Sequence, residues 1–358
     1  MKKYFNFLFS VYGILFILSF SGILLIYGSR SSTQYNFAAA ELALKQFFFL
    51  LAGFTIMDVM RRIKAEKYLA FSRNLFFAAL ILLWGVLFLG VKINGMRGWY
   101  SCYFINLQPS EIFKFIYILH ISNIYLLAKN KEKAFIHSGI LTALWIGAIL
   151  MQPDYGTALL YCLTFAIISF LAGVKFRILL LLPTAALTSL ILFITRKNYG
   201  FERIYVFLFE NTDIFGSAWH WKQFQLTIAR GGWFGNRMDG AFWSNNYLPF
   251  AYNDSAYAAL HEITGFVGAA AILALYFILF FLIYKQCAAR KNNLIILSGI
   301  GAVMTNLLLH CSVNCVIIPT TGVTMPLISY GGSSLIGTFM IFGMTLAFCK
   351  ESDSEKTE

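Results

Sequence analysis

The sequence predicts an all-α polytopic membrane protein with about ten transmembrane helices and one large extracytoplasmic loop. Hydrophobic residues make up 59% of 358 positions and charged residues 12%, and the mean hydropathy is +0.70. A soluble domain of this size needs more charge to cover its surface. The apolar residues also come in uncharged runs of about twenty, the length that crosses a bilayer core.

Ten apolar spans can be placed along the chain. They are 5–27, 41–59, 70–92, 110–128, 134–151, 156–174, 178–195, 258–284, 293–313 and 329–349. No small-residue cleavage site follows the first span, so it is expected to be a retained helix rather than a cleaved signal peptide.

Alternate connections between the spans are basic, which predicts that both termini lie in the cytoplasm of a bacterium and that the chain is a multi-pass inner-membrane protein. The net charge is +12, but no nucleic-acid-binding motif accompanies it, so no nucleic-acid partner is expected. The basic connections contain Lys2, Lys3, Arg61, Arg62, Lys64, Lys67, Lys129, Lys131, Lys133, Lys175, Arg177, Lys285, Arg290, Lys291 and Lys350.

Residues 196–257 form the one long connection, on the predicted external side. Long loops in compact proteins are usually functional or disordered, and this one has too many aromatic residues for disorder. Its basic residues oppose the positive-inside bias, which suggests an anionic ligand. No internal repeat supports an inverted-repeat transporter, and residues 1–358 are expected to form a single membrane domain.

The six cysteines lie mostly in apolar runs and include no CxxC pair. They are interpreted as small hydrophobic residues, with no metal site and no disulfide framework.

Two polar motifs flank the middle spans. Gln108-Pro109-Ser110-Glu111 opens the fourth span, and Lys114 shares a helical face with Glu111. This pair is either a structural ion pair or the polar wall of a substrate cavity. Gln152-Pro153-Asp154 follows the fifth span, where Asp154 either lines a site or caps the next helix.

The most distinctive stretch is Pro319-Thr320-Thr321-Gly322-Val323-Thr324-Met325-Pro326-Leu327-Ile328-Ser329-Tyr330-Gly331-Gly332-Ser333-Ser334. Small residues at a helix start can present backbone amides to a phosphate, or they can allow close helix packing. Ser329, Gly331, Gly332 and Ser333 are therefore candidate substrate-binding residues.

Taken together in order, these motifs resemble the SEDS family (shape, elongation, division and sporulation), whose members include FtsW, RodA and SpoVE. The similarity spans nearly the whole chain, and the stretch 319–334 is more similar to FtsW than to RodA. The other matching motifs are Asn94-Gly95-Met96-Arg97-Gly98-Trp99, Gln108-Pro109-Ser110-Glu111, Gln152-Pro153-Asp154, Gly156-Thr157-Ala158, Leu248-Pro249 and Asp254.

The resemblance implies a peptidoglycan glycosyltransferase that polymerises lipid II by inverting transfer from an undecaprenyl-diphosphate-linked disaccharide-peptide, in division or elongation. It also implies a class B penicillin-binding protein as partner, besides membrane lipids. The family's catalytic aspartate ends a Leu-Pro-Glu-x-His-Thr-Asp segment, which maps it onto Asp254.

Several positions around this segment depart from the family pattern. They are Phe250, Tyr252, Asn253, His261, Arg237, Asp239 and, in the ninth span, His310. A non-catalytic scaffold that activates a penicillin-binding protein is therefore an alternative, and a lipid II flippase is another. A flippase would place its ionisable groups near mid-bilayer, whereas here they concentrate in the external loop.

Glycan polymerisation needs a base for the attacking hydroxyl and positive charge for the departing diphosphate. Asp254 is the expected base. Lys222, Arg230, Arg97 and Arg237 are the expected cationic group, and Glu111, Lys114 and Asp154 complete the expected substrate-binding set. No metal cage is visible, so a divalent cation such as Mg²⁺ or Mn²⁺ would be bound largely through the substrate diphosphate.

Overall fold

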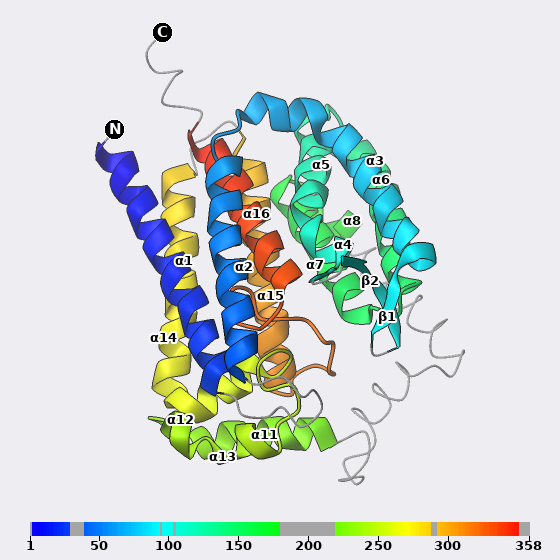
Figure 1. Cartoon of the computed structure of the whole chain (residues 1–358). Helices are drawn as coiled ribbons and strands as arrows, with labels where there is room; N and C mark the ends of the chain where they lie inside the picture. The colour runs from blue at the N-terminus through cyan, green and yellow to red at the C-terminus, as the bar shows by residue number, and fades with distance from the viewer. Residues whose placement is uncertain are drawn as a thin grey trace. The chain divides into compact units, whose positions relative to one another are not determined.

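The computed structural model describes residues 2–28, 39–93, 95–102, 105–179, 219–287 and 292–350. Helices dominate this part of the chain (Figure 1). The long ones are α1 Lys2–Gly28, α2 Ala39–Met60, α3 Ala65–Leu89, α5 Lys114–Leu127, α6 Lys131–Leu150, α7 Tyr155–Leu171, α11 Trp219–Gly231, α14 Ala256–Cys287, α15 Asn293–Asn314 and α16 Gly332–Lys350. Short helices are α4 Pro109–Ile112, α8 Phe176–Leu179, α12 Arg237–Gly240 and α13 Phe242–Asn246.

A small antiparallel sheet follows α3 and corrects the expectation of a chain without strands. Its strands β1 Val91–Ile93, β2 Met96–Cys102 and β3 Ile105–Leu107 lie in the order β1-β2-β3. Val91 pairs with Trp99 and Tyr100 pairs with Leu107. The dipeptide Asn94-Gly95 between β1 and β2 is a typical hairpin signal, and Gly95 has φ +83°.

Every predicted span except the seventh corresponds to a helix, so the polytopic helical architecture is confirmed. Seven of the described helices are long and apolar enough to cross a membrane, and α5 and α7 are shorter apolar helices. The seventh predicted span, 178–195, and residues 196–218 of the external loop lie largely outside the described residues. The described part of that loop contains α11, α12 and α13 rather than irregular chain.

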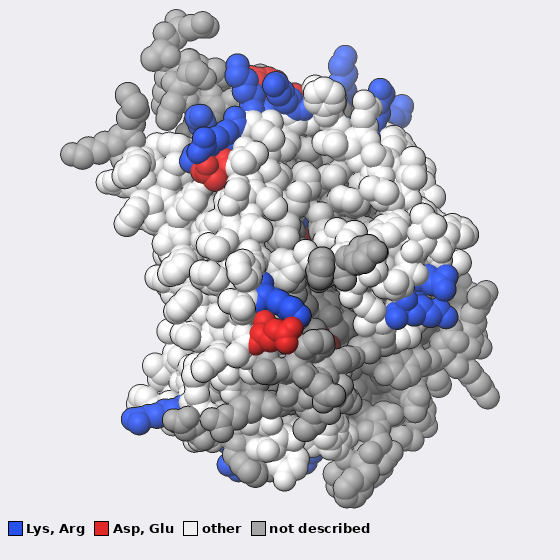
Figure 2. Space-filling view, in the orientation of Figure 1, with Lys and Arg blue, Asp and Glu red and all other residues white. Residues whose placement is uncertain are grey.

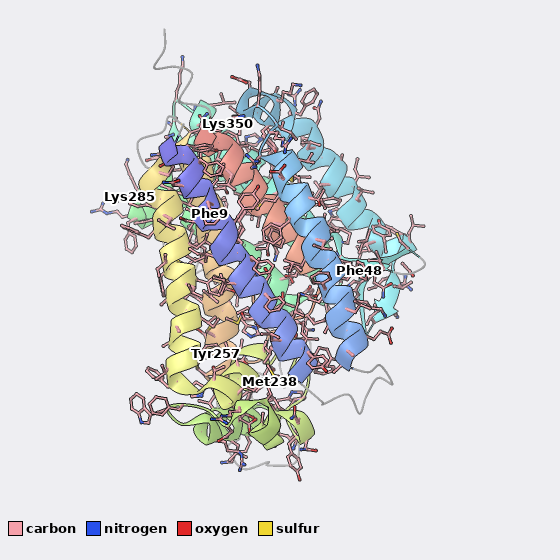
Figure 3. All side chains as sticks on the ribbon, turned by 60° about the vertical axis from the view of Figure 1, so that its left-hand side comes forward. Phe9, Phe48, Met238, Tyr257, Lys285 and Lys350 are labelled. Atoms are coloured by element: carbon pink, nitrogen blue, oxygen red, sulfur yellow. The ribbon has the colours of Figure 1, made fainter. Side chains whose placement is uncertain are left out.

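The helix surfaces are those of a membrane protein. Phe9 on α1 is 74% exposed and Phe48 on α2 is 61% exposed (Figure 3), as expected when lipid replaces water around apolar side chains. Figure 2 shows large uncharged areas on the face drawn, with charged side chains in a few separate patches. Lys285 and Lys350 lie toward the same end in Figure 3, as the predicted alternation of basic connections requires.

The described chain forms two compact units, each assembled from distant segments. Unit 1 comprises residues 1–50, 187–283 and 306–331, and unit 2 comprises 51–186, 284–305 and 332–358. The single domain expected over 1–358 stays a prediction.

Unit 2 has an aromatic core formed by α3, α5, α6 and α7. The Trp145 ring lies 5.0 Å from that of Phe76 and 5.5 Å from that of Tyr117, and the Tyr117 ring lies 4.8 Å from that of Tyr161. All four side chains are almost completely buried. The Tyr117 and Tyr161 rings meet edge to face and the other two pairs are tilted. The buried area of these four rings stabilises the unit.

Unit 1 contains a break in α14 at Gly265, whose φ is +70°. The amides after the break bond outside the helix, Phe266 N–H to Gly232 O at 2.9 Å and Val267 N–H to Trp233 O at 3.1 Å. A side chain at Gly265 would collide with the backbone of residues 233–235. The turn after α11 therefore packs directly against the kink of α14 and accepts the hydrogen bonds that the kink frees.

One cysteine departs from the expectation of a chain without disulfides, because Cys349 is disulfide-bonded. It lies fully buried near the end of α16. Sequence spacing does not reveal such a bond, because it depends on which helix ends meet in the fold. Cys102, Cys162, Cys311 and Cys315 are free thiols.

Candidate active site

Asp254 lies in a tight turn of unit 1 that leads into α14. Phe250 takes the left-handed conformation with φ +49°, and its carbonyl accepts hydrogen bonds from Asn253 N at 2.8 Å and Ser255 N at 3.3 Å. The Ser255 hydroxyl donates to Pro249 O at 2.5 Å. A bulky residue with positive φ is uncommon and persists where surrounding contacts enforce it, as at functional sites.

The loop between α15 and α16 is hydrogen-bonded to this turn. Tyr330 N–H donates to Tyr252 O at 2.7 Å, and the Ser329 hydroxyl donates to Asn253 O at 2.7 Å. The same hydroxyl accepts from Met325 N at 2.9 Å. Ser329, predicted as a substrate-binding residue, thus joins the loop to the segment that carries Asp254.

Gly322 forms the neighbouring wall of the site. A Cβ atom at this exposed glycine would lie 3.9 Å from Asp254 Oδ2, and its φ is +69°. Asn253 directly precedes Asp254, and Thr321 directly precedes Gly322. The buried oxygens Asn253 Oδ1 and Thr321 Oγ1 have no hydrogen-bond partner within the described structure. Buried polar atoms are normally bonded, so these two indicate a place for a water molecule or a ligand hydroxyl.

The start of α14 does not depend on the Asp254 carboxyl for capping. Its N–H groups at positions 256, 257, 258 and 259 all have other acceptors, namely Asn253 O, His310 Nε2, Asn314 Oδ1 and Ser255 O. A helix leaves four such groups to be satisfied at its start. The described structure thus supplies these four N–H groups with acceptors from Asn253, Ser255 and α15.

The predicted cationic residues of the loop lie on α11 and α12. Arg230 Nε lies 3.5 Å from Oε1 of the fully buried Glu262, whose Oε2 accepts from Ser244 N at 2.7 Å. Lys222 and Arg237 are exposed. Arg97 belongs to unit 2, where its Nη1 donates to Leu87 O at 3.0 Å.

Gln46 on α2 is a site residue that the sequence analysis missed. Its Nε2 donates to Ser329 O at 3.2 Å, and its Oε1 accepts from Gly331 N at 3.3 Å. The Gly331 amide, a predicted phosphate donor, is thus used to hold the loop. A glutamine inside an apolar span is the signal that could have identified it, because buried amides in membrane helices mark specific contacts.

Unit 2 brings the other predicted polar residues together. Lys114 Nζ lies 2.8 Å from Glu111 Oε2 in a buried ion pair, and Gln108 Nε2 donates to Asp154 Oδ2 at 3.2 Å. The Ser333 hydroxyl accepts from Gln108 N at 3.0 Å, and Gly332 begins α16.

Asp154 is the N-cap of α7, which confirms the capping alternative, because its Oδ1 accepts from Thr157 N at 3.0 Å. Burial raises the pKa of the Asp154 carboxyl, whereas the bonds from Thr157 lower it.

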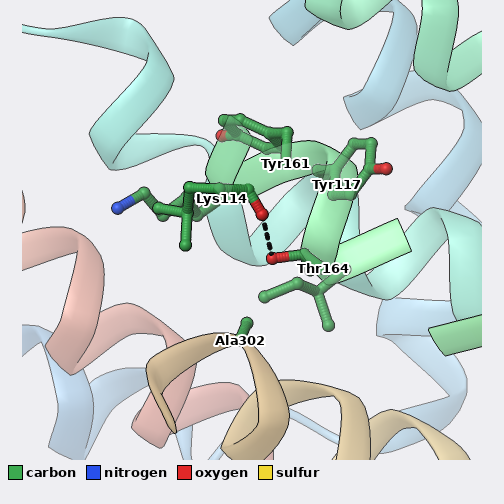
Figure 4. A pocket seen from close by; sticks show the side chains of 7 residues that line it. Lys114, Tyr117, Tyr161, Thr164 and Ala302 are labelled. Atoms are coloured by element: carbon green, nitrogen blue, oxygen red, sulfur yellow. Dashed lines mark hydrogen bonds between the residues drawn. The ribbon is translucent and has the colours of Figure 1, made fainter. Parts of the chain in front are cut away.

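A small cavity adjoins this cluster within unit 2. Lys114, Tyr117, Tyr161, Thr164 and Ala302 surround it, and a Thr164 hydroxyl bonded to Leu160 O at 2.8 Å lies at its edge (Figure 4). Its volume of about 10 Å³ is no more than a single water molecule would need. The cavity therefore gives no room for a lipid or sugar in this conformation.

Among the residues that the structure describes, no group of three or more His, Cys, Asp or Glu side chains could hold a metal ion. The turn formed by residues 249–255 contains one carboxylate, that of Asp254. A cation bound there would therefore need most of its ligands from a bound anion.

Comparison with known proteins connects this geometry to a family. A profile of the cell cycle proteins FtsW, RodA and SpoVE matches residues 2–354. The chain belongs to the FtsW/RodA/SpoVE family. A relative from Aliivibrio salmonicida, named "Probable peptidoglycan glycosyltransferase FtsW", is 31% identical over 316 residues that cover 85% of this chain and 79% of that protein. The predicted family membership is confirmed.

Two solved structures share the FtsW/RodA/SpoVE fold. A chain of a peptidoglycan synthase complex, described for its coordination of polymerization and crosslinking, is 24% identical with a TM-score of 0.79, and the match covers 97% of both chains. The rod shape determining protein RodA of Thermus thermophilus is 24% identical with a TM-score of 0.68, over 97% of this chain and 96% of that one. Both support the polytopic helical fold.

Proposed function

We propose that this protein is a peptidoglycan glycosyltransferase that polymerises lipid II into glycan strands, with Asp254 as the general base. Family membership supports the reaction class, and relatives carry this activity in their names. The observation that supports the residue is its position in the turn before α14, where Phe250 has φ +49° and a Cβ at Gly322 would lie 3.9 Å from Asp254 Oδ2. An aspartate in a strained turn, with the exposed Gly322 beside its carboxylate, suits chemistry.

In the proposed step, Asp254 takes the proton of a sugar hydroxyl while that oxygen attacks C1 of a lipid-linked muramyl unit. The new C1–O bond forms as the bond from C1 to the diphosphate breaks, and the lipid diphosphate leaves with the electron pair. Attack opposite to the leaving group inverts the configuration at C1. A positioned base contributes roughly a hundredfold to ten-thousandfold in rate.

Positive charge must meet the diphosphate as it departs. Lys222 and Arg237 are exposed, and Arg230 keeps 45% of its side chain exposed while it pairs with Glu262. We assign this role to the three residues as a group. Mg²⁺ or Mn²⁺ would add charge at the same place, held mainly by the diphosphate oxygens.

The proposed partner is a class B penicillin-binding protein that crosslinks the product. The similarity to a chain of a peptidoglycan synthase complex supports such an assembly. The proposed location is the bacterial inner membrane, with both termini cytoplasmic and Asp254 on the external face, where lipid II displays its sugars. The basic connections support this orientation.

A non-catalytic scaffold is the second candidate, because Phe250, Tyr252 and Asn253 depart from the family's segment. In the structure, the backbone carbonyls of all three residues bind the turn or the neighbouring loop. Backbone contacts of this kind tolerate side-chain changes, which favours an active enzyme over a scaffold.

The deciding experiment is a gel assay of glycan chains made from labelled lipid II by the purified protein in bilayer discs, with and without its penicillin-binding partner. We expect chains from the wild-type protein, longer or faster with the partner. No chains under either condition, with the partner's crosslinking still stimulated, would support the scaffold. Transfer of lipid II across vesicles without chain formation would support the flippase.

A further inference from the structure

The N-terminus of α14 is capped by side chains from another helix. Two residues one turn apart on α15, His310 and Asn314, reach the first turn of α14. Tyr257 N–H donates to His310 Nε2 at 3.3 Å, and Ala258 N–H donates to Asn314 Oδ1 at 3.1 Å. Both α15 side chains are completely buried, and Tyr257 is labelled at the end of α14 in Figure 3.

His310 can make its contacts only as a neutral ring with the proton on Nδ1. Nδ1 lies 2.7 Å from Val323 O, a carbonyl that can only accept, so Nδ1 must donate. Nε2 is then the acceptor that the Tyr257 amide requires. The ring therefore joins the start of α14 to Val323, the residue directly after Gly322.

Asn314 connects the same helix start to Asp254 itself. Its Oδ1 accepts from Ala258 N, and its Nδ2 donates to the Asp254 carbonyl oxygen at 3.0 Å. Nδ2 also donates to His310 O at 3.0 Å, which orients the amide. Every polar atom of the Asn314 side chain is thus engaged, as a buried amide requires.

We propose that His310 and Asn314 are positioning residues that place the Asp254 carboxylate against Gly322. One residue holds the main chain of Asp254 and the other holds the loop that forms the opposite wall. This inference rests on the proposed function, since it assigns to the pair the alignment of the proposed base. Misplacement of a catalytic group by about 1 Å can cost a hundredfold in rate.

The test compares Asn314→Leu with the control Asn123→Leu. Asn123 is a buried amide on α5 of unit 2 that donates to Ser72 Oγ at 2.9 Å, outside the proposed machinery. We expect Asn314→Leu to lower kcat for glycan synthesis at least about tenfold with KM for lipid II little changed. Asn123→Leu should lower Tm by a similar amount and leave kcat within about twofold of wild type.

A second pair of variants keeps the test informative if Asn314→Leu folds poorly. His310→Gln retains one donor and one acceptor, whereas His310→Leu retains neither. We expect the glutamine to recover a large part of the kcat that the leucine loses. Hydrogen–deuterium exchange at Tyr257 and Ala258 should speed up in His310→Leu and Asn314→Leu and stay at the wild-type rate in Asn123→Leu.

Each outcome separates this inference from the proposed function. If Asp254→Asn abolishes synthesis while Asn314→Leu and His310→Leu keep the kcat of the control, the positioning role is wrong and the base stands. If Asp254→Asn retains full synthesis, the base is wrong. Unchanged exchange at Tyr257 and Ala258 in both leucine variants would show that the pair does not cap α14 and would overturn the inference directly.

Discussion

Gln46 on α2 donates from Nε2 to the carbonyl oxygen of Ser329, while its Oε1 accepts from the amide of Gly331. One side chain thus satisfies both a backbone carbonyl and a backbone amide of this loop, as a neighbouring β-strand would do. The Gln46 side chain is 1% exposed, and its bond to Ser329 is buried whereas its bond to Gly331 is part-buried. This contact keeps Ser329 in the position from which its hydroxyl reaches the turn of Asp254.

Gln46→Leu should therefore destabilise the protein by about 1–3 kcal/mol, since it removes the partner of the buried Ser329 carbonyl and of the half-buried Gly331 amide. The measurement is Tm in detergent or bilayer discs, together with the rate of glycan synthesis, which should also fall. The neighbouring Lys45 is the control. Its exposed pair with Glu41 contributes little, so Lys45→Gln should leave Tm close to wild type, and an equal drop would contradict the role of Gln46.

Asp254→Asn should give a protein that inserts and folds at wild-type level but polymerises lipid II at least about a hundredfold more slowly. The amide cannot take the hydroxyl proton, and the N–H groups of α14 keep their acceptors. The assay is initial rate of chain formation, with membrane level as the control. Near-normal synthesis would remove Asp254 from the mechanism.

Gly322→Ala should reduce glycan synthesis at least about tenfold, because the added methyl would lie 3.9 Å from Asp254 Oδ2, on the side from which we propose that the acceptor sugar approaches. The positive φ adds a backbone cost of about 1–2 kcal/mol. Gly173→Ala is the matched control, since its φ is +81° and nothing lies within 4 Å of an added Cβ. Equal activity in the two variants would show that the methyl at position 322 does not obstruct the site.

Arg230→Gln should slow glycan synthesis while changing stability by less than about 1 kcal/mol, because the arginine side chain is half exposed. Glu262→Ala should cost about 1–3 kcal/mol, since it leaves the buried Ser244 N–H without its acceptor, while the arginine that remains is half exposed. Thermal unfolding and chain synthesis, measured on both variants, check these expectations. A large stability loss in Arg230→Gln would indicate a structural rather than a substrate-binding role.

Topology reporters provide a separate check on orientation. A fusion after Glu358 should report a cytoplasmic end, and a fusion near residue 210 an external one, because the basic connections alternate with apolar spans. An external C-terminus would contradict the orientation on which the placement of Asp254 depends.

Most of the helical architecture could be predicted because lipid-facing helices carry their signal in local composition. Span length and charge alternation are properties of neighbouring residues. The β1-β2-β3 sheet was not predicted, because it is short and lies between two strong apolar runs. The dipeptide Asn94-Gly95 is the hairpin signal in this segment of the sequence.

The site was harder to predict because its contacts join residues far apart in sequence. Resemblance made Asp254 and Ser329 candidates, but the contact of Gln46 with Ser329 depends on a bond across 283 positions. His310 looked like a departure from the family pattern, whereas the structure shows it bonded at both ring nitrogens. Only the contacts in the folded structure show whether a residue that departs from the family pattern has lost its role or makes new interactions.

From the break at Gly265 we expect a particular order of assembly. The first amides after the break, those of Phe266 and Val267, donate to the carbonyls of Gly232 and Trp233, which leave the ribosome earlier. These partners are separated by about thirty residues, a short loop to close, so the hairpin can form before α15 and α16 are made. Asp254 would then already stand at the tip of a finished hairpin when the last two spans are inserted beside it.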